Sequence, residues 1–312
     1  MKLYTEQDKY SKQSNAVVTV GTFDGLHRGH LQIMGTMKNI AKKINGKSIV
    51  ITFNPHPRSV VSQNYDLKLL TTFDEKKRIL EKIEIDELIV LNFTKEFSQL
   101  TSDQFIKNYL VDKFGTVHMV VGHDHKFGKD RLGDEDKLRE LGRVYNFDVT
   151  AVPPETNDGE IISSTKIRNA LYEGNVEKAN LLLGRNYTFT GRVVQGARRG
   201  RVLGFPTANM KLHDINKAIP KKGVYIVACS CEKESYYGIM NIGYRPTFED
   251  RTELVIEVHI LNFNKDIYGK ELSVDFIKRL RDEKKFESKY DLINQIEEDK
   301  KKALELINVL VS

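Results

Sequence analysis

Cysteine and long apolar runs are the scarce features of this chain of 312 residues. Only two cysteines occur, Cys229 and Cys231, and their spacing inside an apolar stretch offers too few ligands for a zinc site. We expect two buried thiols in a reducing compartment. No run approaches the roughly 18 apolar residues of a membrane span, and the first residues lack the apolar core of a signal peptide. The sequence thus predicts a cytoplasmic protein that does not contact a membrane.

A block of charge of one sign is also absent. The 49 Lys and Arg residues are interspersed with 43 Asp and Glu residues, so a mixed, solvated surface explains the net charge of +6 and the pI near 9.0. Nucleic acid is therefore not an expected partner, whereas basic clefts suit anionic small molecules such as phosphates. With 40% hydrophobic and 29% charged residues, the chain has a globular composition, and its length suits two domains. These properties leave self-association open.

The first half of the chain alternates short apolar runs with helix-like segments. Continuous runs rich in β-branched residues, separated by helices, are typical of a parallel sheet with both faces covered. We therefore expect a doubly wound α/β domain over residues 1–183, ending in a helix that Gly184 closes. The expected strands are residues 16–20, 48–53, 87–91 and 118–121.

The second half, residues 184–312, has a different texture. Strand-like segments follow one another closely, with turn residues and no long helices between them, which favours a small antiparallel β-barrel. The end of the chain, residues 274–311, returns to helical periodicity and predicts terminal helices. The expected strands are residues 187–194, 223–231, 236–242 and 253–261.

The most informative segment is residues 21–30, GTFDGLHRGH, directly after the first expected strand. Gly21 and Gly25 let the backbone pass close to a ligand, and a helix that begins near His27 aims its N-terminal amides at a phosphate. His27 and His30 are three residues apart and share one face of that helix. Two imidazoles there suit the α-phosphate of a nucleotide, where negative charge grows during displacement. The segment matches neither the Rossmann fingerprint nor the P-loop.

A second phosphate-binding element is expected at residues 163–168, SSTKIR, which open another helix. The hydroxyls and amides of Ser163 and Ser164, with the guanidinium of Arg168 one turn later, suit a triphosphate and the departing pyrophosphate. Ordinary helix capping by either serine stays an alternative.

The histidines of this half allow another interpretation. His27, His30 and His56, together with His123-Asp124-His125, could form the metal cluster of a metallohydrolase. We favour the nucleotide site, because nucleotide chemistry already accounts for the first pair of histidines.

A phosphate-binding candidate of the second half lies in residues 200–209, GRVLGFPTAN. Glycines, Gly204 among them, permit backbone contact with phosphate, and Pro206 keeps Phe205 out of helical geometry. Thr207 and Asn209 point the same way in an extended segment, and their oxygens make a hard-cation site for Mg²⁺ bound to ATP. A plain turn leading into a strand is the alternative.

At residues 21–30 the chain resembles the HxGH nucleotidylyltransferases, and with Phe23 and Asp24 it is similar to the adenylyltransferase domain of the bacterial bifunctional riboflavin kinase/FAD synthetase family. Residues 54–57 (NPHP), 122–128 (GHDHKFG) and 163–168 match that family in order, although His125 replaces its commoner Phe. The resemblance implies ATP binding by Gly21, Phe23, Asp24, Gly25, Ser163, Ser164 and Arg168. It implies flavin binding by Asn54, His56 and Asp124.

The motif GFPTAN at residues 204–209 is distinctive of riboflavin kinases, and residues 223–225, 241–248 and 281–286 also resemble that family in the right order. The resemblance implies that Gly204, Thr207 and Asn209 bind ATP, the latter two through Mg²⁺, and that the segment from Arg281 to Phe286 borders the flavin. On the strand around Glu257, apolar residues take one face, so Glu257 and His259 share the other.

The family places its catalytic glutamate at Glu257, where a carboxylate base activates the 5′-hydroxyl of riboflavin, a neutral alcohol. Solvent exposure is the ordinary alternative for such a Glu. The resemblance implies that riboflavin and ATP give FMN in the second half, and that FMN and ATP give FAD and pyrophosphate in the first. That step needs no strong base, because the FMN phosphate is already ionised, so positioning, cations and Mg²⁺ suffice.

Two rival functions remain. A nucleotidylyltransferase for a nicotinate, pantetheine or cytidylyl acceptor would use the same fold in the first half, but it would not need the GFPTAN domain. A basic RNA-binding protein built on the barrel would show exposed aromatics interleaved with Lys and Arg, and the barrel segments lack that alternation.

Overall fold

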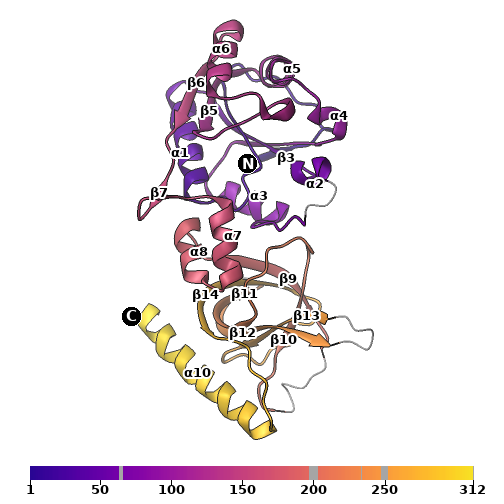
Figure 1. Cartoon of the computed structure of the whole chain (residues 1–312), viewed down its shortest axis with the longest axis vertical. Coiled ribbons are helices and arrows are strands. Elements are labelled where there is room, and N and C mark those ends of the chain that lie inside the picture. The colour runs from indigo at the N-terminus through magenta and orange to yellow at the C-terminus, as the bar shows by residue number, and fades with distance from the viewer. Residues whose placement is uncertain (63–65, 197–202, 233, 247–251, 312) are drawn as a thin grey trace. The chain divides into compact units, whose positions relative to one another are not determined.

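The computed structural model describes residues 1–62, 66–196, 203–232, 234–246 and 252–311. The chain divides into two compact units, Met1–Ser164 and Thr165–Ser312 (Figure 1). Residues 200–202 and 247–248 of the motifs lie outside the described residues.

The first unit is built on a parallel sheet of six strands in the order β1-β4-β3-β2-β5-β6. Two expected strands, 16–20 and 87–91, have the predicted bounds, and the other two are one to three residues longer. The edge strands β1 and β6 were not predicted, because both are short and only partly buried. The strands are β1 (Lys2–Tyr4), β2 (Ala16–Val20), β3 (Lys47–Phe53), β4 (Glu87–Leu91), β5 (Thr116–Gly122) and β6 (Asp148–Val152), with the separate hairpin β7 (Thr156–Asn157) and β8 (Glu160–Ile161).

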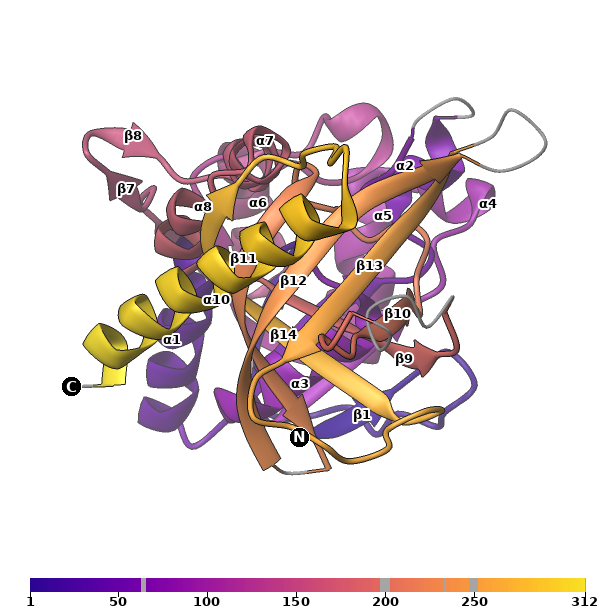
Figure 2. The same cartoon turned by 90° about the horizontal axis from the view of Figure 1, so that it is seen from below.

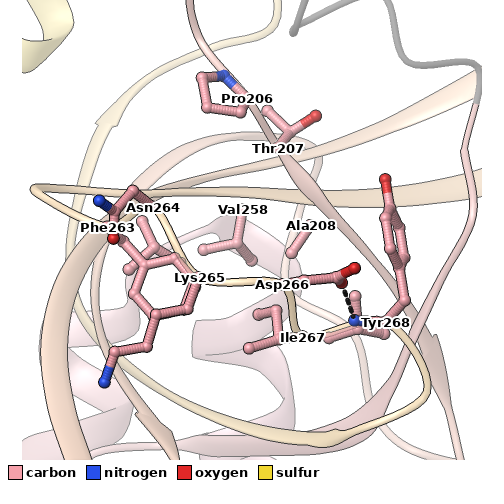
Figure 3. A pocket seen from close by; sticks show the side chains of 12 residues that line it. Pro206, Thr207, Ala208, Val258, Phe263, Asn264, Lys265, Asp266, Ile267 and Tyr268 are labelled. Atoms are coloured by element: carbon pink, nitrogen blue, oxygen red, sulfur yellow. Dashed lines mark hydrogen bonds between the residues drawn. The ribbon is translucent and has the colours of Figure 1, made fainter.

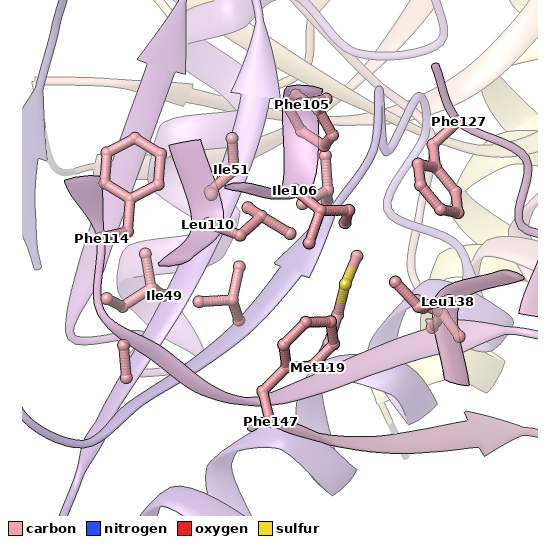
Figure 4. Packing of buried hydrophobic residues seen from close by; sticks show 14 of the residues in the cluster. Ile49, Ile51, Phe105, Ile106, Leu110, Phe114, Met119, Phe127, Leu138 and Phe147 are labelled. Atoms are coloured by element: carbon pink, nitrogen blue, oxygen red, sulfur yellow. The ribbon is translucent and has the colours of Figure 1, made fainter. Parts of the chain in front are cut away.

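Helices cover both faces of this sheet. Val17 of β2 packs with the buried residues of α1 and α3, whereas its neighbour Val18 packs with those of η1 and α6. The second cluster contains Phe105 and Phe114 against Ile51 of β3 (Figure 4). Each such buried side chain contributes about 1.5–3 kcal/mol. The helices are α1 (Arg28–Lys43), α2 (Pro57–Val61), α3 (Phe73–Lys82), α4 (Lys95–Ser98), α5 (Ser102–Phe105), the π-helix η1 (Ile106–Lys113), the 3₁₀-helix η2 (Lys129–Arg131) and α6 (Glu135–Tyr145).

The second unit is a closed antiparallel barrel in the order β10-β13-β12-β11-β14-β9. Aromatic rings fill its interior, where Phe276 packs edge-on against Phe189 and Tyr225. The helix before the barrel ends at Gly184 in the left-handed conformation, as predicted. Cys229 and Cys231 are buried free thiols, also as predicted. The elements are α7 (Ser164–Glu173), α8 (Val176–Leu183), β9 (Thr188–Val194), β10 (Ala208–Leu212), β11 (Gly223–Cys231), β12 (Glu234–Pro246), β13 (Thr252–Ile260), β14 (Glu271–Arg281) and α10 (Lys289–Val311).

The helical prediction for residues 274–288 is wrong. Residues 274–281 belong to β14, which closes the barrel between β11 and β9, and the terminal helix begins only at Lys289. Leu272, Val274 and Phe276 alternate with polar residues and face the interior, so the strand period decides the structure there. Helix α10 lies along the outside of β11 and β12, where Ala303 and Ile307 pack on their outward side chains (Figure 2).

No helix in the described ranges is both long enough and apolar enough to cross a bilayer. The expected fold class, a doubly wound α/β domain followed by a small antiparallel barrel, is confirmed.

Candidate active sites

The first candidate site lies at the carboxyl edge of the parallel sheet. From β2 the chain builds β3 and β4 on one side, and it then crosses to build β5 and β6 on the other. Ligands of open α/β sheets bind at such a reversal, beyond the carboxyl ends of the strands. Residues 21–30 follow β2, residues 54–57 follow β3 and residues 122–125 follow β5, so the fold brings these three motifs to one edge.

His27 and His30 form a stacked pair at the start of α1. His27 is the N-cap of this helix, and its Nδ1 accepts a hydrogen bond from the His30 amide at 3.4 Å. The two ring centroids are 3.6 Å apart with an interplanar angle of 18°. The rings of Phe23 and His30 make a T-shaped contact, with centroids 5.3 Å apart. The spacing predicted both the helix start and the shared face, and the structure confirms them.

Hydrogen bonds made by Asp24 fix the turn before α1. The Asp24 Oδ1 accepts hydrogen bonds from the amides of Leu70 and Thr71 at 2.8 and 3.1 Å. The Gly25 amide donates to the Thr71 hydroxyl at 3.1 Å, and the Ser164 hydroxyl donates to the Asp24 carbonyl at 2.8 Å. Asp24 is buried, so its visible role is to shape the turn. Direct contacts of Asp24 and Ser164 with ATP stay predictions.

The two other positions of this motif also fit a close turn. A Cβ atom at Gly21 would lie 3.0 to 3.3 Å from atoms of the Phe23 ring, which is tighter than ordinary contact, so any larger residue would require that ring to shift. Gly25 has a φ of 87°, which favours glycine.

Of the second phosphate-binding motif, Ser163 precedes α7, and Arg168 lies within α7 in the second unit. The capping alternative for the serines stays open.

The predicted flavin residues of the first half lie on loops at the same edge. Asn54 follows β3, and its amide donates to the Leu91 carbonyl at 3.0 Å. His56 is the N-cap of α2, and its Nδ1 accepts from the Arg58 amide at 3.2 Å. Asp124 is exposed, whereas His125 stacks on Phe127 with centroids 5.6 Å apart. Flavin contact by these residues remains a prediction.

Across the part of the chain that the structure describes, no three His, Cys, Asp or Glu side chains gather closely enough to hold a metal ion.

The second candidate site is a row of side chains on the outside of the barrel. Asn209 of β10 pairs with Glu257 of β13, and Glu257 pairs with Asn241 of β12 on its other side. Directly paired residues lie on the same face of a sheet with their Cβ atoms about 5 Å apart. The neighbours Ile256 and Val258 are buried in the interior, so the row faces outward. Asn241 was not predicted as a site residue, because only the register of β12 and β13 places it beside Glu257.

A cavity of about 380 Å³ is lined by Thr207 and by the inward-facing residues Val258 and Ile260 of β13 (Figure 3). Thr207 lines it, whereas Asn209 belongs to the row, and Gly204 precedes both in the loop before β10 with a φ of 87°. The Asp266 carboxylate accepts a hydrogen bond from the Tyr268 amide at 3.0 Å, which folds the loop of residues 263–268 that also lines the cavity. The remaining lining is mostly apolar, with polar residues at its edge: Val193, Pro206, Ala208, Val258, Ile260, Phe263, Asn264, Lys265 and Ile267.

Residues 263–268 were not identified as site residues from the sequence. They follow β13 in a loop without a phosphate-binding pattern, and only the closure of the barrel brings them to Thr207.

Arg281 and Phe286 lie at the end of β14 and beyond it. The Arg281 guanidinium makes an ion pair with Asp299 of α10, with 2.7 Å between Nη2 and Oδ2. It also lies 6.0 Å from the centroid of the Phe286 ring. Asp299 does not lie on a solvated helix face, because its side chain is only 4% exposed. Flavin contact by Arg281 and Phe286 stays a prediction.

Comparisons with known proteins match both units. The FAD synthetase family model matches residues 9–166, and the riboflavin kinase family model matches residues 183–307. The bifunctional riboflavin kinase/FMN adenylyltransferase of Listeria monocytogenes is 40% identical over 288 residues, covering 91% of this chain and 90% of that protein. The protein of the same name from Escherichia coli K12 is 35% identical over 298 residues, covering 95% and 94%.

A solved structure shares the fold. The crystal structure named as a macrolide-efflux protein from Streptococcus pneumoniae is 32% identical and has a TM-score of 0.89, covering 96% of this chain and 98% of that one. An FAD synthetase match followed by a riboflavin kinase match does not fit a transferase for another acceptor. This chain belongs to the family of bifunctional riboflavin kinase/FMN adenylyltransferases, and its activities are the phosphorylation of riboflavin to FMN and the adenylylation of FMN to FAD.

Proposed function

We propose that the two reactions use two separate sites with different chemistry. FMN forms on the outer face of the barrel around Glu257, and FAD forms at the N-terminus of α1 around His27 and His30. The register that places the Glu257 carboxylate between Asn209 and Asn241 carries this proposal. The barrel site offers a carboxylate to an alcohol, whereas the helix terminus offers imidazoles and amides to a phosphate.

In the barrel, Glu257 is the proposed general base. It accepts the proton of the riboflavin 5′-hydroxyl while the hydroxyl oxygen attacks the γ-phosphorus of ATP and ADP leaves. The hydroxyl of Thr207 and the amide oxygen of Asn209 are hard donors that fit Mg²⁺. When bound, this ion neutralises negative charge on the transferred phosphate.

The cavity beside Thr207 is the proposed place of the ATP nucleoside. Its volume of about 380 Å³ and its apolar wall suit a flat base, and Asn264, Asp266 and Tyr268 supply polar groups at its edge. The phosphates of a nucleotide bound there are proposed to lie at Thr207, which lines the cavity from the GFPTAN loop.

At the helix terminus, His27 and His30 are proposed to bind the α-phosphate of ATP. The Nδ1 of His27 accepts a hydrogen bond, so the neutral ring carries its proton on Nε2 and can donate it to a phosphate oxygen. The first amides of α1 add partial positive charge. The ionised FMN phosphate attacks the α-phosphorus and pyrophosphate leaves, so the site needs positioning and cationic neutralisation and no strong base.

The chemistry of FAD formation is proposed for residues 1–183, which include Arg168, and that of FMN formation for residues 184–312. The requirement of both reactions for ATP favours action in the cytoplasm.

Two substitutions in the full chain test this division. Glu257→Gln should lower FMN formation about 10²- to 10⁴-fold and leave the conversion of FMN to FAD unchanged. His30→Ala should lower the conversion of FMN to FAD and leave FMN formation unchanged. Chromatography of products from riboflavin, ATP and Mg²⁺, and separately from FMN, ATP and Mg²⁺, measures both activities. If either variant lost both reactions, or if Glu257→Gln still made FMN normally, the division would be refuted.

A further inference from the structure

The loop before β10 is tied to β13 by one side chain, His259. Its Nδ1 lies 2.9 Å from the carbonyl oxygen of Pro206, which is 53 residues away in the chain. Its ring also packs in a T-shaped contact with Phe205, with centroids 5.7 Å apart at 80°. His259 is two residues after Glu257 on the outward face of the strand, so it extends the row of the barrel site.

This hydrogen bond has a defined direction. A carbonyl oxygen only accepts, so the proton of the neutral His259 ring must be on Nδ1. The Nδ1 atom therefore donates and the Pro206 carbonyl accepts.

The hydrogen bond from His259 fixes the chain at Pro206, before the pairing of β10 with β13 begins. The pairing of β10 with β13 begins at Ala208, which lies opposite Val258. Pro206 has no amide hydrogen and so cannot donate to a ladder. Its carbonyl belongs to the peptide that leads into Thr207, so the His259 contact fixes the backbone from which the Thr207 side chain projects.

We propose that His259 is a positioning residue of the riboflavin kinase site, which holds the Pro206–Thr207 peptide so that the Thr207 hydroxyl meets Mg²⁺ and the phosphates of ATP. This inference rests on the proposed role of Thr207. His259 itself does not touch the reacting atoms in this scheme. Its loss should weaken the use of Mg·ATP more than it slows the chemical step.

A matched pair of variants separates the hydrogen bond from the ring contact. His259→Asn keeps an N–H donor the same number of bonds from the backbone as Nδ1, but it loses the ring. His259→Phe keeps a ring against Phe205, but it loses the donor. His213→Phe is the control, because His213 is a half-exposed histidine of the barrel unit whose partner is Glu271.

The experiment uses the full chain and measures the kcat, the KM for ATP and the Mg²⁺ dependence of riboflavin phosphorylation. We expect His259→Phe to raise the KM for ATP about tenfold with a smaller change in kcat, because one ordering hydrogen bond is worth about that factor. His259→Asn should stay within about threefold of the wild type. His213→Phe should match the wild type, and FAD formation from FMN should be unchanged in all three proteins.

Equal effects of His259→Phe and His259→Asn, whether both are normal or both are impaired, would overturn the proposal. Thr207→Ala separates this failure from a failure of the proposed site. If Thr207→Ala impaired the use of Mg·ATP and His259→Phe did not, only the role of His259 would be wrong. If Thr207→Ala had no effect, the proposed Mg²⁺ site would be wrong and the role of His259 with it.

Discussion

Lys76 of α3 is a cation buried beneath the turn that precedes α1. Its Nζ donates to the Thr22 carbonyl at 2.6 Å and to the Thr52 hydroxyl at 3.3 Å. Burial lowers the pKa of Lys76 to about 8, although the nearby Asp24 carboxylate acts in the opposite direction. Phe23, the residue after Thr22, has a φ of 45°, so the turn adopts an unfavourable conformation where this bond supports it.

The buried cation predicts a pH dependence of stability with a defined sign. Below about pH 8, Lys76 is protonated in both states, and the folded state bears the cost of burying the charge. Between pH 8 and the ordinary value of 10.5 the unfolded chain binds more protons, so the unfolding free energy rises with pH. The unfolding free energy of the wild type minus that of Lys76→Met should therefore increase by about 3 kcal/mol across this window.

Urea titrations followed by circular dichroism can measure this difference, since the chain has no tryptophan to report by fluorescence. Subtracting the Lys76→Met curve removes the titrations that both proteins share. A difference that stays flat from pH 7 to 10 would show that the ammonium is not destabilised by burial.

At the scale of elements, local patterns were predictable and cross-strand relations were not. His27 and His30 were found because a helix start and a spacing of three residues are local features. The row of Asn209, Glu257 and Asn241 depends on registers between segments far apart in the sequence, so the sequence alone pointed to Glu257 only through family resemblance. Strand β14 was mistaken for a helix because its end is rich in charge, whereas its alternation at Val274 and Phe276 follows the barrel.

The ion pair between Arg281 and Asp299 anchors helix α10 to β14. Both oxygens of Asp299 accept hydrogen bonds from Arg281, at 2.7 to 3.0 Å, and the two side chains are 4% and 17% exposed. Asp299→Asn should lower the unfolding free energy of the barrel unit by about 3 kcal/mol, because it leaves a largely buried guanidinium without its counter-charge. Urea unfolding of the full chain, with riboflavin kinase activity reporting the barrel, measures the loss.

The control for this pair lies in the same unit. Glu234 and Lys265 are similarly close, 2.6 Å apart, but both are more than half exposed. Glu234→Gln should leave the unfolding free energy close to that of the wild type, since water screens an exposed pair. Equal losses in the two variants would mean that burial of the Asp299 pair does not matter.

At the scale of the molecule, the boundary between the two compact units differs from the proposed boundary between the two reactions. The proposed adenylylation residues extend to Arg168, yet residues 165–183 belong to the compact unit of the barrel. Within that unit, the Lys221 amide donates to the Leu171 carbonyl at 2.8 Å. Asn180 of α8 accepts from the Tyr187 amide at 2.7 Å and donates to the Phe276 carbonyl at 2.8 Å. Helices α7 and α8 therefore complete the barrel that follows them.

This arrangement predicts which fragment is stable. Residues 165–312 should fold and phosphorylate riboflavin without making FAD, whereas residues 184–312 should be less stable by at least about 3 kcal/mol. The shorter fragment loses these hydrogen bonds, worth about 1 kcal/mol each, and the burial of α8 against β14. Urea titrations of both fragments measure the difference, and Asn180→Ala in the longer one should account for about 2 kcal/mol of it. Fragments of equal stability would instead place both helices outside the folding unit of the barrel, so that the folding boundary would coincide with the proposed chemical one at Gly184.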